Sequence, residues 1–436
     1  MMKRNAAWLI VLLGLGTLPL FAAPLKMWRM ETARPDCRPG VEFNSAPNAY
    51  TVKLDEKNGM FGKWVAIYKL PASGNGCKFQ VRHNAGADVV AGELVVCSVS
   101  WQDAAGKDVV TAYMEPEGDG LFTRTLRRPK DAVTVRISMG VRNYYKPVTF
   151  SDVVCEAVDI TPRPVRIVVS KCSPQWGGRA TCEDNLARME KVWQLLEINQ
   201  EKPDLVVFPE TFLTRAVRNL GIDKGAQTIP GPHTAWAAAW AKKLNTNVVV
   251  SLREKNDGRY YNSAVVIDRA GKIAGVYRKT QLCISEYENG YDWGTDLPVF
   301  QLDFGKIGVL ICWDLWFPEA ARTLRLRGAE VIAYPIAATG RKHFDWMWSS
   351  RAMENGVVLA ASIAGGDTCP ARVVMPDGEV AAETYYQQTY AAATVDLSDL
   401  PVNIPWLSVG SGAGESRSFY IHERHPELYR SLSDKR

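Results

Sequence analysis

Three residues of complementary chemistry each follow a short apolar run in this sequence. They are a carboxylate, an amine and a thiol: Glu210, Lys279 and Cys312. The apolar runs are predicted to be buried strands, and α/β proteins build their sites where such strands end. The three side chains are therefore candidates for a single hydrolytic centre.

The chemistry that such a centre supports is nucleophilic attack on a carbonyl carbon. A thiol must lose its proton to attack, and Glu210 could take that proton and later return one to a leaving nitrogen. A cationic Lys279 would favour the thiolate and stabilise the oxyanion of the tetrahedral intermediate. The expected products are a thioester, which water then hydrolyses, and free ammonia or amine.

Each residue also has an ordinary structural interpretation. A cysteine at the end of an apolar strand is usually a small buried hydrophobe. A glutamate after Phe-Pro usually lies in a solvated turn, and a lysine at a hairpin end usually lies on the surface. Only the order and context of all three residues favour a catalytic interpretation.

The elements that must position these residues alternate between strands and helices from 165 to 400. Helices are predicted at 182–199, 232–244, 318–326 and 343–355. Pro318 in the first turn of the third helix and Gly328 just past its end are typical helix boundaries. Strands are predicted at 166–172, 204–208, 247–252, 261–268, 273–278, 299–303, 306–312, 330–333, 357–363, 371–375 and 391–395. This pattern predicts two layers of helix around strands.

The region before residue 160 is rich in short β runs and has little helical pattern. Strands are predicted at 64–70, 93–102, 109–113, 132–141 and 148–157, separated by Gly, Pro and Asp turns. This spacing is typical of a β-sandwich, assigned here to residues 23–160. The two prolines in 159–164 predict a stiff connector to the α/β region of 165–400. Residues 401–436 form a C-terminal extension.

Residues 165 to about 395 resemble the nitrilase superfamily of carbon–nitrogen hydrolases, which use a Glu-Lys-Cys triad in this chain order. The resemblance rests on six strings in register: 203–210, 277–282, 304–322, 351–355, 376–379 and 423–429. It implies an α+β fold, a four-layer αββα sandwich, here preceded by the all-β, jelly-roll-like domain. It also implies a homodimer or higher oligomer and no cofactor.

The resemblance implies two further site residues. The backbone N–H of Trp313, the residue after the nucleophile, would donate to the oxyanion beside Lys279. The superfamily places a second glutamate near the lysine, and here Glu286 is preferred, with Glu288 as the alternative. Ser362 replaces a frequent Asn, which puts substrate contacts on that side in doubt.

The string 312–319 is most similar to the N-carbamoyl-amine and amidase branches. That similarity favours a linear amide or N-carbamoyl substrate over a nitrile. The five histidines do not suggest a metal site or a Cys-His protease, because His422 and His425 lack the spacing that sets two ligands on one helical face. No metal is expected.

The first 22 residues have the pattern of a signal peptide. Lys3 and Arg4 precede an apolar run that is too short for a bilayer and ends at Ala22 and Ala23. The protein is therefore expected to be secreted or periplasmic, without a membrane span. The net charge of +5 is modest and does not suggest a nucleic-acid partner. Nine cysteines permit disulfides in that compartment, but Cys312 must stay free to act as a nucleophile.

The N-terminal region also resembles, weakly, the jelly-roll modules that bind carbohydrate. Its aromatic residues could stack on sugars, although a core position is the commoner use of such residues; they are Trp64, Trp101, Tyr113, Tyr144 and Tyr145. One alternative function is therefore a glycan- or cell-surface-binding protein with a degenerate hydrolase scaffold. Nitrile hydrolysis and acyl transfer to an amine are further alternatives.

Overall fold

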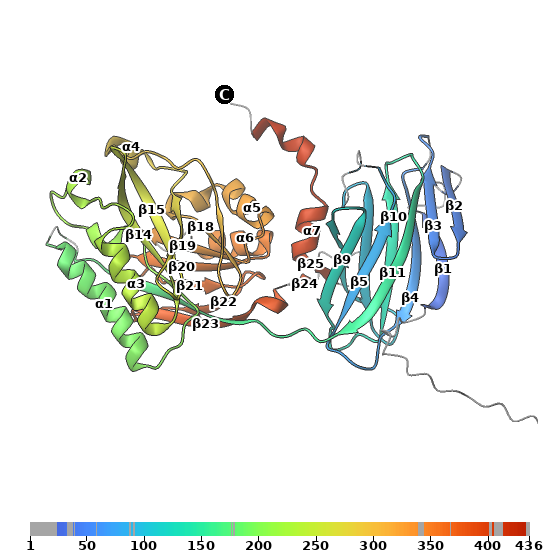
Figure 1. Cartoon of the computed structure of the whole chain (residues 1–436), viewed down its shortest axis with the longest axis horizontal. Coiled ribbons are helices and arrows are strands. Elements are labelled where there is room, and N and C mark those ends of the chain that lie inside the picture. The colour runs from blue at the N-terminus through green and yellow to red at the C-terminus, as the bar shows by residue number, and fades with distance from the viewer. Residues whose placement is uncertain are drawn as a thin grey trace, which may run out of the picture. The chain divides into compact units, whose positions relative to one another are not determined.

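The structure is a computed structural model of the 436-residue chain. It describes residues 24–32, 38, 40–57, 59–86, 89, 92–175, 177, 179–338, 344–366, 368–400, 403–404 and 413–432. The predicted signal peptide lies outside these residues. The chain forms two units, one of residues 1–109 and 113–160, the other of residues 110–112 and 161–436. Each unit is described separately below (Figure 1).

The N-terminal unit is built from two antiparallel sheets. In this unit, the first sheet has the order β1 (Pro24–Thr32), β4 (Phe61–Lys69), β10 (Thr134–Arg142), β6 (Val95–Gln102) and β7 (Asp108–Tyr113). The second has the order β2 (Val41–Ala46), β3 (Ala49–Leu54), β11 (Val148–Val158), β5 (Gly76–His83), β9 (Leu121–Arg127) and β8 (Glu115–Glu117). The sequence pattern missed β1, β2, β3, β5, β8 and β9.

The core of this unit lies between its sheets. The Trp101 ring from β6 meets the Phe79 ring from β5 edge-on, with centroids 5.7 Å apart. Trp64 and Trp101 are 5% and 1% exposed, and Tyr144 is also buried. These three aromatic side chains therefore contribute to the core, as the commoner use of such residues predicted, while Tyr145 is exposed.

The C-terminal unit contains two sheets joined through β12 (Pro164–Cys172). The first runs β16 (Ile273–Arg278), β15 (Arg259–Ile267), β14 (Asn247–Asn256), β13 (Leu205–Val207) and β12, with β23 (Tyr390–Asp396) antiparallel to β12. The second runs β20 (Val358–Ala364), β19 (Val331–Ala337), β18 (Lys306–Val309) and β17 (Val299–Gln301), with β21 (Arg372–Val374) and β22 (Val380–Glu383) beyond β20. β12 pairs with β20 only at its last two residues.

Helices cover the outer faces of both sheets. α1 (Cys182–Ile198) and α3 (Pro232–Leu244) share a core with one face of the first sheet, and α5 (Pro318–Leu326) and α6 (Phe344–Asn355) pack on the second. Along β13, Val206 belongs to the core with α1 and α3, whereas Leu205 and Val207 belong to the core between the sheets. This alternation follows from the two-residue period of a strand. The predicted four-layer αββα sandwich is confirmed.

The remaining elements are short. They are η2 (Phe212–Thr214), α2 (Ile222–Gly225), α4 (Ile284–Glu288), η3 (Cys312–Trp316), η4 (Leu397–Asp399), β24 (Asn403–Ile404), β25 (Ala413–Glu415), α7 (Ser416–His422) and η6 (Pro426–Leu432). No helix among the described residues combines the length and the apolar character needed to cross a membrane.

Local signals set the bounds of α3 and α5, which begin and end where the sequence predicted. Each begins with a proline at its first turn, and Gly328, with φ of +96°, follows the end of α5. The predicted strand 306–312 is wrong at its end, because β18 stops at Val309. The Ile311 N–H donates to Asp314 Oδ2 at 2.8 Å instead of continuing the ladder, and η3 begins at Cys312.

Candidate active site

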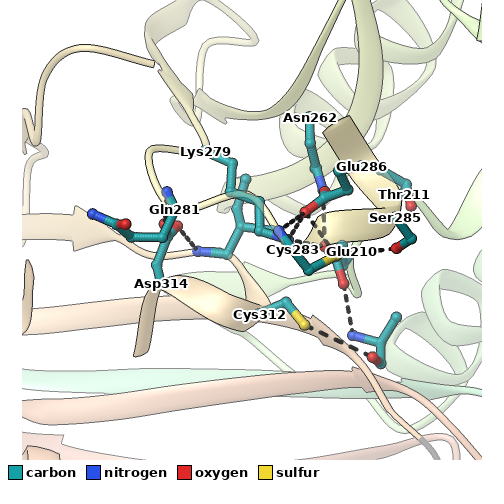
Figure 2. Close-up of polar contacts among 12 residues, drawn as sticks. Glu210, Thr211, Asn262, Lys279, Gln281, Cys283, Ser285, Glu286, Cys312 and Asp314 are labelled. Carbon is teal, nitrogen blue, oxygen red and sulfur yellow. Dashed lines mark hydrogen bonds and ion pairs between the residues drawn. The ribbon is translucent and has the colours of Figure 1, made fainter. Parts of the chain in front are cut away.

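Glu210, Lys279 and Cys312, which are far apart in the sequence, line one cavity of about 330 Å³. Glu210 lies three residues after β13, Lys279 directly after β16, and Cys312 three residues after β18. Figure 2 shows the carboxylate beside the ammonium and the thiol. The structure therefore brings together all three predicted side chains.

Glu210 is held from three directions. Its Oε1 accepts from Lys279 Nζ at 3.1 Å and from Asn262 Nδ2 at 2.8 Å, and its Oε2 accepts from the Ala337 N–H at 3.0 Å. The residue is 4% exposed. These donors orient the carboxylate in a cavity wall that it shares with Cys312.

Lys279 is 1% exposed and lies between two carboxylates. Its Nζ donates to Glu286 Oε2 at 2.7 Å, in addition to its contact with Glu210. Burial disfavours the ammonium, but the negative charges of Glu210 and Glu286, with the hydrogen bond to Glu286, outweigh burial and raise the pKa of Lys279. Lys279 is therefore a cation at neutral pH, as an oxyanion-binding role requires.

The second glutamate beside the lysine is Glu286 rather than Glu288. Glu286 lies on α4, and its carboxylate also accepts from Asn262 Nδ2 at 2.8 Å and from the Cys283 N–H at 3.0 Å. Although burial opposes ionisation, Lys279 and Asn262 lower the pKa of Glu286. Glu288 is exposed and does not line the cavity.

Cys312 begins η3 with φ of +45°, in the left-handed region that costs energy for a residue with a side chain. Its Sγ lies 3.8 Å from the Ala337 carbonyl oxygen. Burial and the charge of Glu210 raise the pKa of the Cys312 thiol, while Lys279 lowers it to a smaller extent. The resting nucleophile is therefore a neutral thiol that needs a base during attack.

Asp314 fixes the turn after Cys312 to the loop that follows Lys279. Its Oδ2 accepts from Tyr277 Oη at 2.6 Å and from the Ile311 N–H at 2.8 Å, and its Oδ1 accepts from the Gln281 N–H at 2.8 Å. Figure 2 shows the contact between Gln281 and Asp314. Asp314 is fully buried, so these bonds replace its water contacts.

Trp313 follows Cys312 in η3, with its indole 38% exposed and 5.5 Å from the Trp316 ring. Its backbone N–H belongs to the residue next to the nucleophile, and the role of this N–H as an oxyanion donor stays a prediction. The Tyr334 hydroxyl donates to the Cys312 carbonyl oxygen at 2.7 Å, which further holds this turn.

Asn262, which donates to both Glu210 and Glu286, was not predicted from the sequence. The available signal was an amide among the apolar residues of β15, where it is 3% exposed. Two arginines of the cavity wall, Arg215 and Arg253, were also not predicted. Ser362, by contrast, is fully buried in β20, where it donates to the Ser170 carbonyl oxygen at 2.7 Å, and it does not line the cavity.

In the part of the chain that the structure describes, no group of three or more His, Cys, Asp and Glu residues is placed to hold a metal ion. No described histidine lines the cavity. Cys312 is a free thiol, as are the other described cysteines: Cys77, Cys97, Cys155, Cys172, Cys182, Cys283 and Cys369.

Comparisons with known proteins identify the family and the fold of the C-terminal unit. Residues 170–401 match the family model described as carbon-nitrogen hydrolase. A protein of Pseudomonas protegens named "Hydrolase in pqqF 5′region" is 30% identical over 306 residues, which are 67% of this chain and 99% of the relative. The N-carbamoylputrescine amidase of Arabidopsis thaliana is 35% identical over 213 residues, 44% of this chain and 70% of the relative. A carbon-nitrogen hydrolase from Helicobacter pylori G27 has a similar fold, with a TM-score of 0.53 and 23% identity, over 63% of this chain and 99% of that one.

Proposed function

The chain belongs to the carbon–nitrogen hydrolase family of the nitrilase superfamily, and from this premise we propose that it cleaves a linear amide or an N-carbamoyl compound through Cys312. The observation that carries the proposal is the convergence of Cys312, Glu210 and Lys279 in one cavity. The names of relatives such as N-carbamoylputrescine amidase support this substrate class.

The first half of the reaction forms a thioester. Glu210 takes the proton from Cys312 as Sγ bonds to the carbonyl carbon, and the oxyanion that forms faces Lys279 Nζ and the Trp313 N–H. The intermediate then collapses, the C–N bond breaks, and Glu210 returns the proton to the leaving nitrogen. Ammonia or an amine departs, and the acyl group stays on sulfur.

The second half regenerates the thiol. Water attacks the thioester carbon while Glu210 takes its proton, and the same ammonium and N–H stabilise the second oxyanion. The C–S bond breaks, the sulfur regains a proton, and the acid leaves. Because burial and Glu210 keep the resting thiol neutral, the first half-reaction needs Glu210 as its base. In the second half-reaction the same carboxylate acts as the base for water.

An ammonia-release screen over amides, N-carbamoyl compounds and nitriles tests the proposal. We expect turnover of a compound from the first two classes and a fall of at least ~10³-fold in kcat for Cys312→Ala. Cys182→Ala is a matched control, because Cys182 is a free, half-buried thiol that does not line the cavity. Equal rates for wild type and Cys312→Ala would contradict the proposal, as would turnover of nitriles alone.

Chemical labelling of Cys312 distinguishes an enzyme from a binding protein with a degenerate hydrolase scaffold. A thiol-directed acylating reagent should label Cys312 ahead of the buried cysteines, and a substrate should protect it. Labelling without any substrate protection would favour the binding protein.

We also propose export from the cytoplasm and assembly into a homodimer or higher oligomer. The signal-peptide pattern of residues 1–22 supports export. Membership of the superfamily supports oligomerisation. Sedimentation of the purified protein tests the second point, and a monomer at micromolar concentration would contradict it.

A further inference from the structure

Two arginines share the cavity with the candidate nucleophile. Arg215 directly follows η2, and Arg253 lies in β14; both are partly buried and line the same 330 Å³ cavity as Cys312. A cavity of this size suits a small molecule. One such molecule could therefore contact the thiol and the arginines at once.

Neither guanidinium is neutralised by a carboxylate of the described residues. Arg253 Nη1 donates to the Leu220 carbonyl oxygen at 3.3 Å. The buried Nε of Arg253 has no hydrogen-bond partner among the described residues. The Arg215 side chain forms neither an ion pair nor a hydrogen bond with any described residue. A guanidinium in a cavity wall that has no carboxylate partner can donate to a planar acceptor of a ligand.

The carboxylates of the cavity are already engaged. Glu210 and Glu286 both contact Lys279 and Asn262, and neither forms an ion pair with Arg215 or Arg253. With both glutamates ionised, the lysine and the two arginines give the lining one excess positive charge. This balance favours an anionic ligand.

Tyr291 lines the cavity together with the two arginines and Cys312. Burial raises the pKa of Tyr291 to about 12, Arg253 opposes that rise, and Glu286 and Glu210 add to it. Tyr291 lines the same cavity as Arg253, Glu210 and Glu286. Because Cys312 and both arginines also line this cavity of about 330 Å³, a small substrate bound in it can contact both sides.

We propose that the substrate carries a carboxylate that Arg215 and Arg253 bind while its amide or carbamoyl group lies at Cys312. The substrate class is then an N-carbamoyl amino acid or the half-amide of a dicarboxylic acid. This inference rests on the proposed amidase function. A guanidinium donates two parallel hydrogen bonds to a carboxylate and repels an ammonium, so the two arginines select substrates by charge.

The test compares compounds of similar size that differ in the charge at the far end. Succinamate, butyramide and β-alaninamide end in a carboxylate, a methyl group and an ammonium; 3-ureidopropionate, butylurea and 3-ureidopropylamine form the carbamoyl series. We expect kcat/KM for the carboxylate compound to exceed the neutral one by ~10- to 100-fold, with the ammonium compound the poorest. Equal rates, or a preference for the ammonium compound, would overturn the inference and leave the amidase function intact.

The Arg215→Gln variant tests whether a preference for the carboxylate compound arises at this arginine. The ratio of kcat/KM between carboxylate and neutral compounds should fall at least about tenfold, with a smaller fall for Arg215→Lys, which keeps the charge. Arg218→Gln is the matched control, because Arg218 is exposed in the same loop and does not line the cavity. A ratio unchanged in Arg215→Gln would also overturn the inference.

Ligand binding to the inactive Cys312→Ala variant tests the carboxylate site without any need for turnover. Calorimetry on that inactive variant should show tighter binding of succinamate than of butyramide, by ~10-fold or more, and Arg215→Gln in the same background should remove the difference. If wild type turns over no compound, the amidase function fails, but this measurement still decides whether the arginines bind a carboxylate.

Discussion

The carboxylates of Glu210 and Glu286 lie in contact with the ammonium of Lys279 in the wall of the cavity that also holds the Cys312 thiol. Lys279 contacts both Glu210 and Glu286, while Asn262 donates to both carboxylates. Burial first, and the charge of Glu210 second, raise the pKa of the Cys312 thiol, so a thiolate is disfavoured before substrate binds. Glu286 and Asn262 are therefore positioning residues for the pair that meets the substrate.

At the scale of single residues, we predict that Glu286→Gln lowers kcat on the order of tenfold. A tenfold change corresponds to the loss of about one pKa unit of charge interaction with Lys279. Because Glu286 helps to raise the pKa of Lys279, the alkaline limb of the pH–kcat profile should move to lower pH. Glu288→Gln, two positions away and exposed, should change neither quantity. A lower kcat with an unmoved alkaline limb would assign Glu286 a purely structural role.

The same substitution should have a pH-dependent cost in stability. The folded-state pKa of Glu286 is below its ordinary value of 4.5, so its stabilising effect is present above that value and is lost as the pH falls through the lowered pKa. We expect Glu286→Gln to reduce the free energy of unfolding by about 1–3 kcal/mol at neutral pH. Urea denaturation between about pH 7 and pH 3 should show this difference shrinking at the acid end. A difference that grows toward acid pH would contradict this assignment.

At the scale of elements, the candidate catalytic side chains all lie in turns that follow strands. β16 leads directly to Lys279, and β18 leads to Cys312, yet these strands belong to different sheets. Asp314 joins the two turns, since its oxygens accept from Gln281 on one side and Ile311 on the other. This carboxylate therefore sets the register of the lysine loop against the nucleophile turn.

Asp314→Asn should loosen that junction. An amide has one acceptor oxygen, so its NH₂ group must face either the Gln281 N–H or the Ile311 N–H, and one buried donor loses its acceptor. We predict a loss of about 2–4 kcal/mol in the free energy of unfolding, with a lower kcat. Asp377→Asn, in the exposed turn between β21 and β22, should stay within about 0.5 kcal/mol of wild type. An Asp314→Asn variant of wild-type stability would show that the junction is held elsewhere.

At the scale of the whole molecule, the chain combines two units with separate cores. The N-terminal unit packs two antiparallel sheets around residues such as Phe79 and Trp101, and the C-terminal unit packs two helix-covered sheets. The cavity is lined by residues of the C-terminal unit alone. The proposed reaction therefore depends on that unit's own elements.

The export proposal predicts a shortened chain in the mature protein. The basic start, the apolar run and the small residues that end it are typical of cleavage after Ala22 or Ala23. Intact-mass measurement and N-terminal sequencing of the protein from a secreting host should show that residues 1–22 are absent. A mature chain that begins at Met1 and stays with the membrane fraction would contradict the proposal.

Local sequence signals were sufficient for much of the hydrolase fold. The prolines and the glycine that bound α3 and α5 act on their immediate neighbours, so the bounds of these helices could be predicted. The strands of the N-terminal unit were harder, because β1, β2 and β3 depend on partners elsewhere in the chain. The sequence also singled out Glu210, Lys279 and Cys312 by type, order and context.

Only the tertiary structure decided which neighbours surround those three residues. Glu286 and Glu288 are equivalent by composition, but residues two positions apart on a helix face different directions, and α4 turns only Glu286 toward Lys279. Asn262 joins the cavity from β15, Arg253 from β14, and Arg215 from the loop after η2. Their roles depend on distances between segments remote in the sequence, which composition and periodicity do not encode.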